Sequence, residues 1–179
     1  SIMFGLLLGI IYISFISLGL PDALLGSGWP IIHEELNVPV SYAGIVSMII
    51  TIGTIISSFF SDKVIRKFGT GLVTAISVAM TAFALFGFSA STKFWMFCLF
   101  SIPYGLGAGS VDAALNNFVA LHYKAHHMSW LHSFWGVGAT LGPVIMGQCL
   151  INQNSWTLGY VVVSLIQIVL TIFLFCSLS

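Results

Sequence analysis

Charged residues are scarce in this sequence, and their scarcity excludes a soluble protein. Only 6% of the 179 residues are Asp, Glu, Lys or Arg, whereas an ordinary soluble domain is about 25% charged. A chain so poor in charge cannot cover a water-facing surface. It cannot be disordered either, because disordered chains are rich in charge and poor in apolar residues.

The few charges balance one another, and cysteine is rare. The net charge is zero, so the chain has no basic patch that would attract nucleic acid. The three cysteines, Cys98, Cys149 and Cys176, lie far apart in apolar runs. This spacing excludes a closely spaced metal or redox motif, and we expect neither a cofactor nor a bound metal.

Apolar residues make up 58% of the chain. A helix that crosses the hydrocarbon core needs about 20 of them, and polar clusters divide the sequence into six such runs. The predicted spans are about 2–29, 40–60, 70–90, 94–121, 129–150 and 156–178. Because lipid cannot satisfy backbone hydrogen bonds and the runs do not alternate like barrel strands, each run predicts a helix. The expected fold class is all-α integral membrane, with residues 1–179 forming one bundle of six transmembrane helices.

The basic residues of the short loops indicate the orientation. The loops after the second and fourth spans hold Lys63, Arg66, Lys67 and Lys124, and the other side holds only Lys93. The positive-inside rule therefore places both termini in the cytoplasm. Tryptophans near predicted span ends are expected to be interfacial anchors, namely Trp29, Trp95, Trp130 and Trp156.

Two carboxylates lie inside apolar spans, Asp22 in the first and Asp112 in the fourth. Each costs about 2.5–3.5 kcal/mol at the centre of a membrane, so such residues usually face the bundle interior and carry function. The helical rise places both well inside the hydrocarbon layer. Desolvation disfavours the charged form of a carboxyl group. Either residue is therefore a candidate proton carrier, or an acceptor of hydrogen bonds from a polyol.

Polar and helix-breaking residues accompany these carboxylates. Asn116 follows Asp112 by four residues and shares its helical face, with Asn117 beside it, which predicts a lined pocket. Pro21 precedes Asp22 and predicts a kink or local unwinding. Interrupted helices near the midplane are typical of transporter binding sites.

The fifth span adds His132 and Trp135, whose three-residue spacing places them on nearly one face. A flat indole beside a hydrogen-bonding imidazole suits a sugar, which has apolar faces and a rim of hydroxyl groups. The alternative interpretation is a core aromatic packed against small residues.

A short internal repeat links the two halves of the chain. The segment 21–26, PDALLG, resembles 111–116, VDAALN, in two units whose first helices run in opposite directions. Nested three-plus-three inverted repeats occur in major facilitator transporters. The sequence therefore predicts two inverted three-helix repeats, at about 1–90 and 91–179.

The loop after the second span resembles the signature loop of the major facilitator superfamily. It reads Ser58-x-x-x-Asp62-Lys63-x-x-Arg66-Lys67-Phe68-Gly69, with Ser58 and Ile65 where the signature has glycine. The resemblance implies a cytoplasmic gate made by Asp62, Lys63, Arg66 and Lys67. It also implies that these six helices are the amino-terminal half of a twelve-helix transporter.

Within that superfamily, the segments 19–25, 105–117 and 133–139 look most like the fucose permease type of sugar–proton symporter. This resemblance implies proton coupling by Asp22 and Asp112. In that type the fourth-helix acid is typically Glu, so Asp112 is one methylene shorter. The implied substrate-binding residues are Asp22, Asp112, Asn116, Asn117, His132 and Trp135.

The predicted function is secondary active transport, namely proton-coupled uptake of a sugar or similar small polar solute by alternating access, and not enzymatic catalysis. The expected partners are the solute, the proton, the lipid bilayer, and a carboxyl-terminal six-helix half or a second copy of this chain, without nucleic acid. The family resemblance implies a bacterial plasma membrane.

Three alternatives stay open. Gly138-Ala139-Thr140-Leu141-Gly142-Pro143 resembles a motif of drug–proton antiporters, although close helix packing through glycines gives the same pattern. His122-x-x-x-His126-His127 resembles one histidine box of membrane di-iron oxidases, which need several such boxes. The chain could also be a complete six-helix protein that pairs with a second copy.

Overall fold

The computed structural model describes residues 2–178 and confirms an all-helical protein with six membrane-spanning stretches. Throughout this described part the chain forms helices and turns, with no strand. The elements are α1 (Ile2–Asp22), α2 (Leu24–Glu35), the 3-10 helix η1 (Val40–Tyr42), α3 (Ala43–Phe68), α4 (Thr70–Ala90), α5 (Phe94–His122), α6 (Ala125–Gln153) and α7 (Trp156–Leu178). Together α1 and α2 make the first span, and α3 to α7 make the other five.

Several helices continue beyond the apolar limits that the sequence predicted. The segments 30–39, 61–69 and 122–128 were expected to be connectors, yet α2 runs to Glu35, α3 runs to Phe68 and α6 begins at Ala125. Hydropathy marks where lipid ends, whereas a helix continues as long as its backbone hydrogen bonds are made. The polar side chains therefore lie on helix ends instead of in loops.

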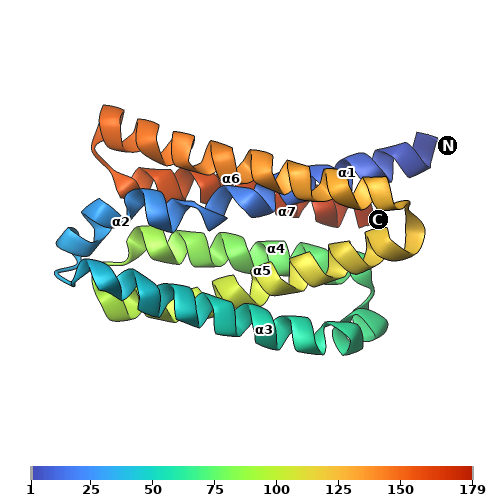
Figure 1. The fold of residues 1–179 in the computed structure, drawn as a ribbon, viewed down its shortest axis with the longest axis horizontal. Coiled ribbons are helices and arrows are strands. Elements are labelled where there is room, and N and C mark those ends of the chain that lie inside the picture. Colours follow the sequence, from blue (N-terminus) through green and yellow to red (C-terminus); the bar gives the residue numbers. More distant parts are fainter. Residues whose placement is uncertain (1, 179) are drawn as a thin grey trace.

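Both termini lie at one end of the bundle, which also holds the α3–α4 and α5–α6 connections (Figure 1). Within the bundle, α1 packs mainly on α6, α3 packs on α5, and α4 packs on both α5 and α7. The first and fourth spans each pack on the second helix of the opposite three-helix unit. This reciprocal pairing supports our proposal of inverted repeats at about 1–90 and 91–179.

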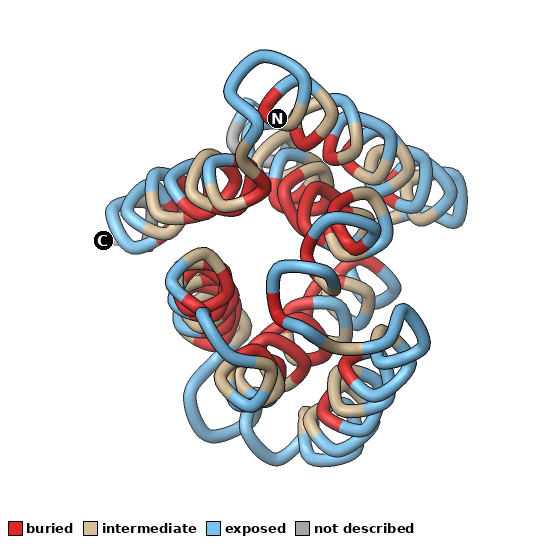
Figure 2. Tube along the Cα trace, turned by 90° about the vertical axis from the view of Figure 1, so that its left-hand side faces the viewer, coloured by how far each residue is buried: buried red, intermediate tan, exposed pale blue. Residues whose placement is uncertain are grey.

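Buried residues face the neighbouring helices, and exposed ones face outward (Figure 2). Large apolar side chains such as Phe59 and Phe83 are exposed, as a lipid-facing surface requires. Polar groups join α4 to α7 inside the bundle, where the Ser164 hydroxyl donates to the Ala82 carbonyl oxygen at 2.9 Å. Nearby, Gln167 Nε2 donates to Thr81 Oγ1 at 3.3 Å. Buried hydrogen bonds of this kind commonly hold membrane helices together.

Two of the four expected interfacial tryptophans have a different role. Trp95 and Trp130 are exposed, but Trp29 and Trp156 are buried. Trp29 Nε1 donates to the Val40 carbonyl oxygen at 2.7 Å, and Trp156 Nε1 donates to a Glu35 carboxylate oxygen. Each indole pins one end of a span to its neighbour, because an N–H group near the membrane boundary finds a protein acceptor there.

Candidate functional site

The first span is interrupted beside Asp22. Helix α1 ends at Asp22 and α2 starts at Leu24, with Ala23 between them at φ −100° and ψ 0°. Pro21 has no backbone N–H and its ring crowds the preceding turn, so the interruption predicted from this proline is confirmed. The Ala23 carbonyl oxygen accepts both the Ser27 backbone N–H at 3.2 Å and the Ser27 hydroxyl at 2.7 Å, so the hydrogen bonds of α2 begin directly after the interruption.

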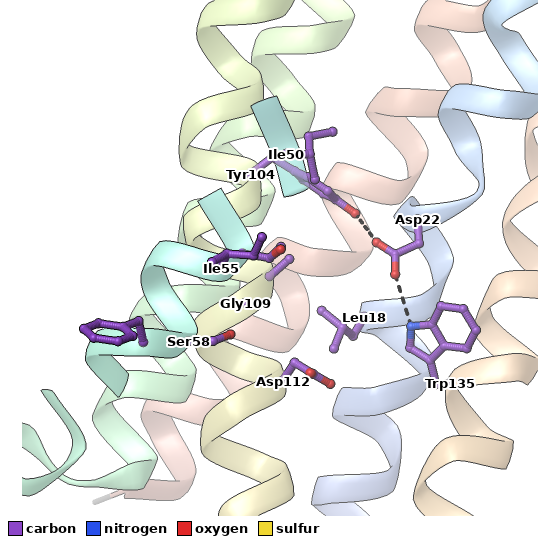
Figure 3. Close-up of a pocket in the computed structure, with 12 residues that line it drawn as sticks. Leu18, Asp22, Ile50, Ile55, Ser58, Tyr104, Gly109, Asp112 and Trp135 are labelled. Atoms are coloured by element: carbon purple, nitrogen blue, oxygen red, sulfur yellow. Dashed lines mark hydrogen bonds between the residues drawn. The ribbon is translucent and has the colours of Figure 1, made fainter. Parts of the chain in front are cut away.

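Both carboxylate oxygens of Asp22 accept hydrogen bonds from other helices (Figure 3). The Tyr104 hydroxyl of α5 donates to Oδ1 at 2.6 Å. Trp135 Nε1 of α6 donates to Oδ2 at 3.1 Å. Asp22 therefore connects α1 to the two helices that carry the other predicted site residues, and the two donated hydrogen bonds offset part of its desolvation.

Asp22 also faces a cavity of about 740 Å³. Asp112 lines the same cavity, so the two intramembrane carboxylates lie on one internal surface and not against lipid. In Figure 3 Asp112 extends from α5 toward α1, below the hydrogen-bonded Asp22. The lining residues are Leu18, Asp22, Ile50, Thr54, Ile55, Ser58, Phe59, Tyr104, Ala108, Gly109, Asp112 and Trp135.

A second cavity, of about 180 Å³, adjoins the opposite side of this site. Three residues line both cavities, namely Asp22, Ile50 and Tyr104. The smaller cavity extends toward the end of the bundle where α2 lies, past Ser47 and Thr51 of α3. The Asp22–Tyr104 hydrogen bond therefore lies at the boundary between two spaces.

None of the other predicted polar residues lines the large cavity, and Asn116 is the one with a hydrogen bond to Asp112 in the described part of the chain. Asn116 Nδ2 donates to Asp112 Oδ1 at 2.9 Å and to the Asp112 carbonyl oxygen at 2.7 Å. Asn117 and His132 are exposed. Asn116 thus orients the Asp112 carboxylate, which faces the large cavity.

Glycines bring α1 and α6 into direct backbone contact beside the site. A Cβ on Gly19 would lie 2.2 Å from the Trp135 carbonyl oxygen, and a Cβ on Gly142 would lie 2.2 Å from the Leu20 carbonyl oxygen. No side chain fits in either place. This part of the antiporter-like segment therefore packs helices closely, and the close approach holds Trp135 within reach of Asp22.

The pair α3 and α5 is built in the same way. A Cβ on Gly105 would lie 2.5 Å from the Ile50 carbonyl oxygen, and one on Gly109 would lie 2.8 Å from the Thr54 carbonyl oxygen. Two tightly packed helix pairs thus form the opposite walls of the large cavity. Backbone contact sets the spacing within each pair, so Asp22 has a fixed place relative to α6 and Asp112 a fixed place relative to α3.

Sequence reasoning missed Tyr104 and the hydroxyl groups of α3. Tyr104 is only 4% exposed and stands in an apolar run where nothing distinguishes it from a packing aromatic. On α3, Ser47, Thr51, Thr54 and Ser58 recur at spacings of four and three, which is one helical face. That periodicity was the available signal, and these residues line the two cavities.

The predicted gate residues lie away from the cavity, on the last turns of α3. Asp62, Lys63, Arg66 and Lys67 are all exposed. Lys67 Nζ lies 5.4 Å from the centre of the Phe68 ring. These charges are free to meet a partner at the end of the bundle that holds both termini.

The histidine-rich turn between α5 and α6 makes local contacts. His122 Nδ1 lies 2.9 Å from the Phe118 carbonyl oxygen, and the Lys124 N–H donates to His127 Nδ1 at 3.1 Å. The rings of His126 and His127 lie 4.0 Å apart. Over residues 2–178, no three His, Cys, Asp or Glu side chains converge as a metal site would require.

The family follows from a comparison with known sequences. Residues 11–178 match the profile described as the Major Facilitator Superfamily. The chain belongs to the Major Facilitator Superfamily. This confirms the superfamily predicted from the loop after the second span, and the six helices fit half of a major facilitator fold. The superfamily consists of membrane transporters, and the fucose permease type stays a hypothesis.

Curated relatives are distant and much longer than this chain. Human synaptic vesicle glycoprotein 2C is 27% identical over 146 residues, which is 78% of this chain and 20% of the relative. Human synaptic vesicle glycoprotein 2B is 26% identical over 131 residues, covering 71% of this chain and 19% of the relative. Rat synaptic vesicle glycoprotein 2A is 23% identical over 144 residues, with coverages of 78% and 19%. The chain thus spans about a fifth of the length of these relatives.

Proposed function

We propose that this chain forms one half of a secondary transporter that couples proton movement to the uptake of a sugar or similar small polar solute. The complete transporter would pair this bundle with a carboxyl-terminal six-helix half or with a second copy. Alternating access would then be a rocking of the two bundles around a site at mid-depth. The proposed coupling residues are Asp22 and Asp112.

The observation that carries the proposal is the environment of Asp22. Its carboxylate faces a cavity, accepts hydrogen bonds from two other helices and lies next to a break in its own helix. A carboxylate that links three helices can change their contacts when it takes up a proton, because protonation removes an acceptor and adds a donor. Protonation and helix arrangement are then coupled, as a proton-driven transporter requires.

The cavity supports a small solute. Its volume of about 740 Å³ falls within the range of about 300–1,000 Å³ that is typical of small-molecule sites. Trp135 offers a flat apolar surface, and the hydroxyl groups of Thr54 and Ser58 lie on the opposite wall. An apolar face opposite a row of hydroxyl groups matches the surface of a sugar. We therefore propose substrate contacts from Asp22, Asp112 and Trp135, with Asn116, Asn117 and His132 supporting Asp112.

We further propose that the bundle end with both termini is cytoplasmic. The last turns of α3 and the α5–α6 connection lie at that end. They carry Lys63, Arg66, Lys67 and Lys124, in accordance with the positive-inside rule. Asp62 and its basic neighbours would there contact the partner bundle and hold one access state closed.

A lipophilic solute moved by antiport is the second candidate. Leu18, Ile50, Ile55 and Phe59 give much of the large cavity an apolar lining, which suits an amphipathic drug better than a sugar. The two candidates predict opposite directions of solute movement in one imposed proton gradient. Flux measured in proteoliposomes that hold the complete transporter therefore decides between them.

The experiment that tests the proposal combines a binding screen with one substitution. Purified complete transporter is screened against hexoses, deoxyhexoses and lipophilic cations, and bound solutes are assayed for proton-driven uptake. We expect Asp22→Asn to abolish uphill uptake while exchange of solute persists. Glu34→Gln, an exposed carboxylate outside the cavities, serves as the control. Unchanged uphill uptake by Asp22→Asn would refute the coupling role.

A further inference from the structure

The two donors that hold Asp22 differ in what they can do. An indole N–H can only donate a hydrogen bond, whereas a phenol hydroxyl can donate and accept. Trp135 therefore requires Oδ2 to remain an acceptor in every protonation state. Tyr104 makes no such demand on Oδ1, since it can turn its hydrogen away and accept instead.

This asymmetry decides where a proton is placed. When Asp22 is charged, the Tyr104 hydroxyl donates to Oδ1 at 2.6 Å. A proton delivered by a hydronium ion in a cavity adds to Oδ1 and leaves a water molecule, because the Trp135 N–H is better satisfied when Oδ2 stays the carbonyl oxygen of the neutral acid, which is its stronger acceptor. The new O–H of Asp22 then donates to the Tyr104 oxygen. The Tyr104 hydrogen must leave Asp22 and find another acceptor.

We infer that Tyr104 is a positioning residue that converts protonation of Asp22 into a hydrogen-bond donor directed at the solute. The inference rests on the proposed proton-coupled transport and specifies how proton and solute are linked at that site. Tyr104 is almost fully buried and lines both cavities, so a group bound in a cavity can accept its released hydrogen. A solute oxygen in the large cavity fills this role.

The arrangement specifies a class of solute. It must present an acceptor oxygen such as a hydroxyl, carbonyl or ether, and it cannot be an anion, because two carboxylates line the cavity and would repel it. A lipophilic cation without an acceptor oxygen gains nothing from the released donor. Since one hydrogen bond separates the two states of Asp22, protonation should tighten solute binding by about 3- to 10-fold.

Other titratable groups around the site do not replace this role. Asp112 faces the same cavity from α5, with His132 of α6 near it. Tyr160 of α7 lines the small cavity near Tyr104. Helix α3 lines both cavities with Ser and Thr instead of acids or bases. Among these groups, only Tyr104 donates a hydrogen bond to Asp22 through a hydroxyl, which can also accept one.

The test compares two variants that each lose one phenol hydroxyl. Tyr104→Phe removes the switch, and Tyr12→Phe removes a hydroxyl that contacts the His127 carbonyl oxygen at 3.5 Å, far from the site. Binding of the hexose and deoxyhexose panel to the complete transporter is measured from pH 5 to pH 9. We expect wild type and Tyr12→Phe to bind one panel sugar more tightly as the pH falls. Tyr104→Phe should still bind it, but with the same affinity across the range.

A second substitution, which preserves packing, tests the inference even if Tyr104→Phe does not fold. Fluorotyrosine at position 104 has nearly the same shape and is a stronger donor to the Asp22 carboxylate, so the pH at which binding tightens should fall. Fluorotyrosine at position 12 should leave that pH unchanged.

The outcomes distinguish a failure of the role of Tyr104 from a failure of the proposed proton-coupled uptake. If Tyr104→Phe keeps the pH dependence, or fluorotyrosine at position 104 leaves it unmoved, Tyr104 does not link the proton to the solute, although proton-driven uptake can still stand. If wild type binds no panel sugar, or binds only lipophilic cations, both the inference and the proposed uptake are wrong.

Discussion

Of the glycines between α1 and α6, Gly138 leaves the least room for a side chain, and a substitution there should disturb the site. A Cβ at this position would lie 1.9 Å from the Ile16 carbonyl oxygen, about 1.5 Å short of the usual C···O separation of about 3.3–3.6 Å. Both atoms belong to helix backbones, so no flexible side chain can move aside. Gly138→Ala must therefore push the two helices apart.

The consequence reaches Asp22, because Trp135 lies less than one helical turn away on α6. Its Nε1 is 3.1 Å from Asp22 Oδ2, and a separation of about 1.5 Å more exceeds hydrogen-bonding distance. Overpacking of this kind costs about 1–3 kcal/mol. We expect Gly138→Ala to lower the unfolding temperature of the purified complete transporter and to weaken solute binding.

Gly136→Ala is the matched control. No atom lies within 4 Å of a Cβ at Gly136, on the same helix two residues away, and alanine improves the intrinsic helix propensity by about 1 kcal/mol. Its unfolding temperature should equal or exceed that of wild type. If the two variants unfold at the same temperature and bind solute equally well, backbone contact does not set the position of Trp135.

Two further predictions concern buried polar contacts, and thermal unfolding of the purified transporter measures both. Gln167 Oε1 is buried without a hydrogen-bond partner, which costs about 1–3 kcal/mol, as much as or more than the about 1 kcal/mol that the Nε2 hydrogen bond to Thr81 contributes; Gln167→Leu should therefore unfold at the same or a higher temperature, and a clear decrease would show that the hydrogen bond to Thr81 outweighs the unpaired oxygen. Trp156→Phe loses its hydrogen bond to Glu35 and should be less stable by about 1 kcal/mol, whereas Trp95→Phe at an exposed position should change little. Equal losses would contradict the pinning role of Trp156.

The fold could be predicted from the sequence because the bilayer restricts the choices. Lipid admits few structures, so six apolar runs with polar interruptions predict six helices. The interruption beside Asp22 was likewise predictable, since Pro21 removes a backbone donor. The predicted ends of the helices were less accurate, because α2 and α3 continue to Glu35 and Phe68, after the hydropathy has fallen.

The site was only partly predictable. Asp22 and Asp112 stand out because a carboxylate within an apolar span is costly, and the structure places both on one cavity. Tyr104 was missed, since a buried tyrosine in an apolar run looks like a packing residue until its hydroxyl partner is known. Trp29 was assigned to the membrane interface by its position in the sequence, but its hydrogen bond to Val40 is a tertiary contact that sequence position does not predict.

Labelling of a cysteine at position 112 shows directly whether the intramembrane carboxylates face a water-filled cavity. In the complete transporter, Cys98, Cys149 and Cys176 are first replaced by Ala. Asp112→Cys is then compared with Phe83→Cys, which lies on the exposed apolar surface of α4, by reaction with a water-soluble, membrane-impermeant thiol reagent in native membranes. A thiol reacts as its thiolate, which needs water. We expect rapid labelling of Asp112→Cys and slow labelling of Phe83→Cys; equal rates, or faster labelling at position 83, would show that position 112 does not face a water-filled cavity.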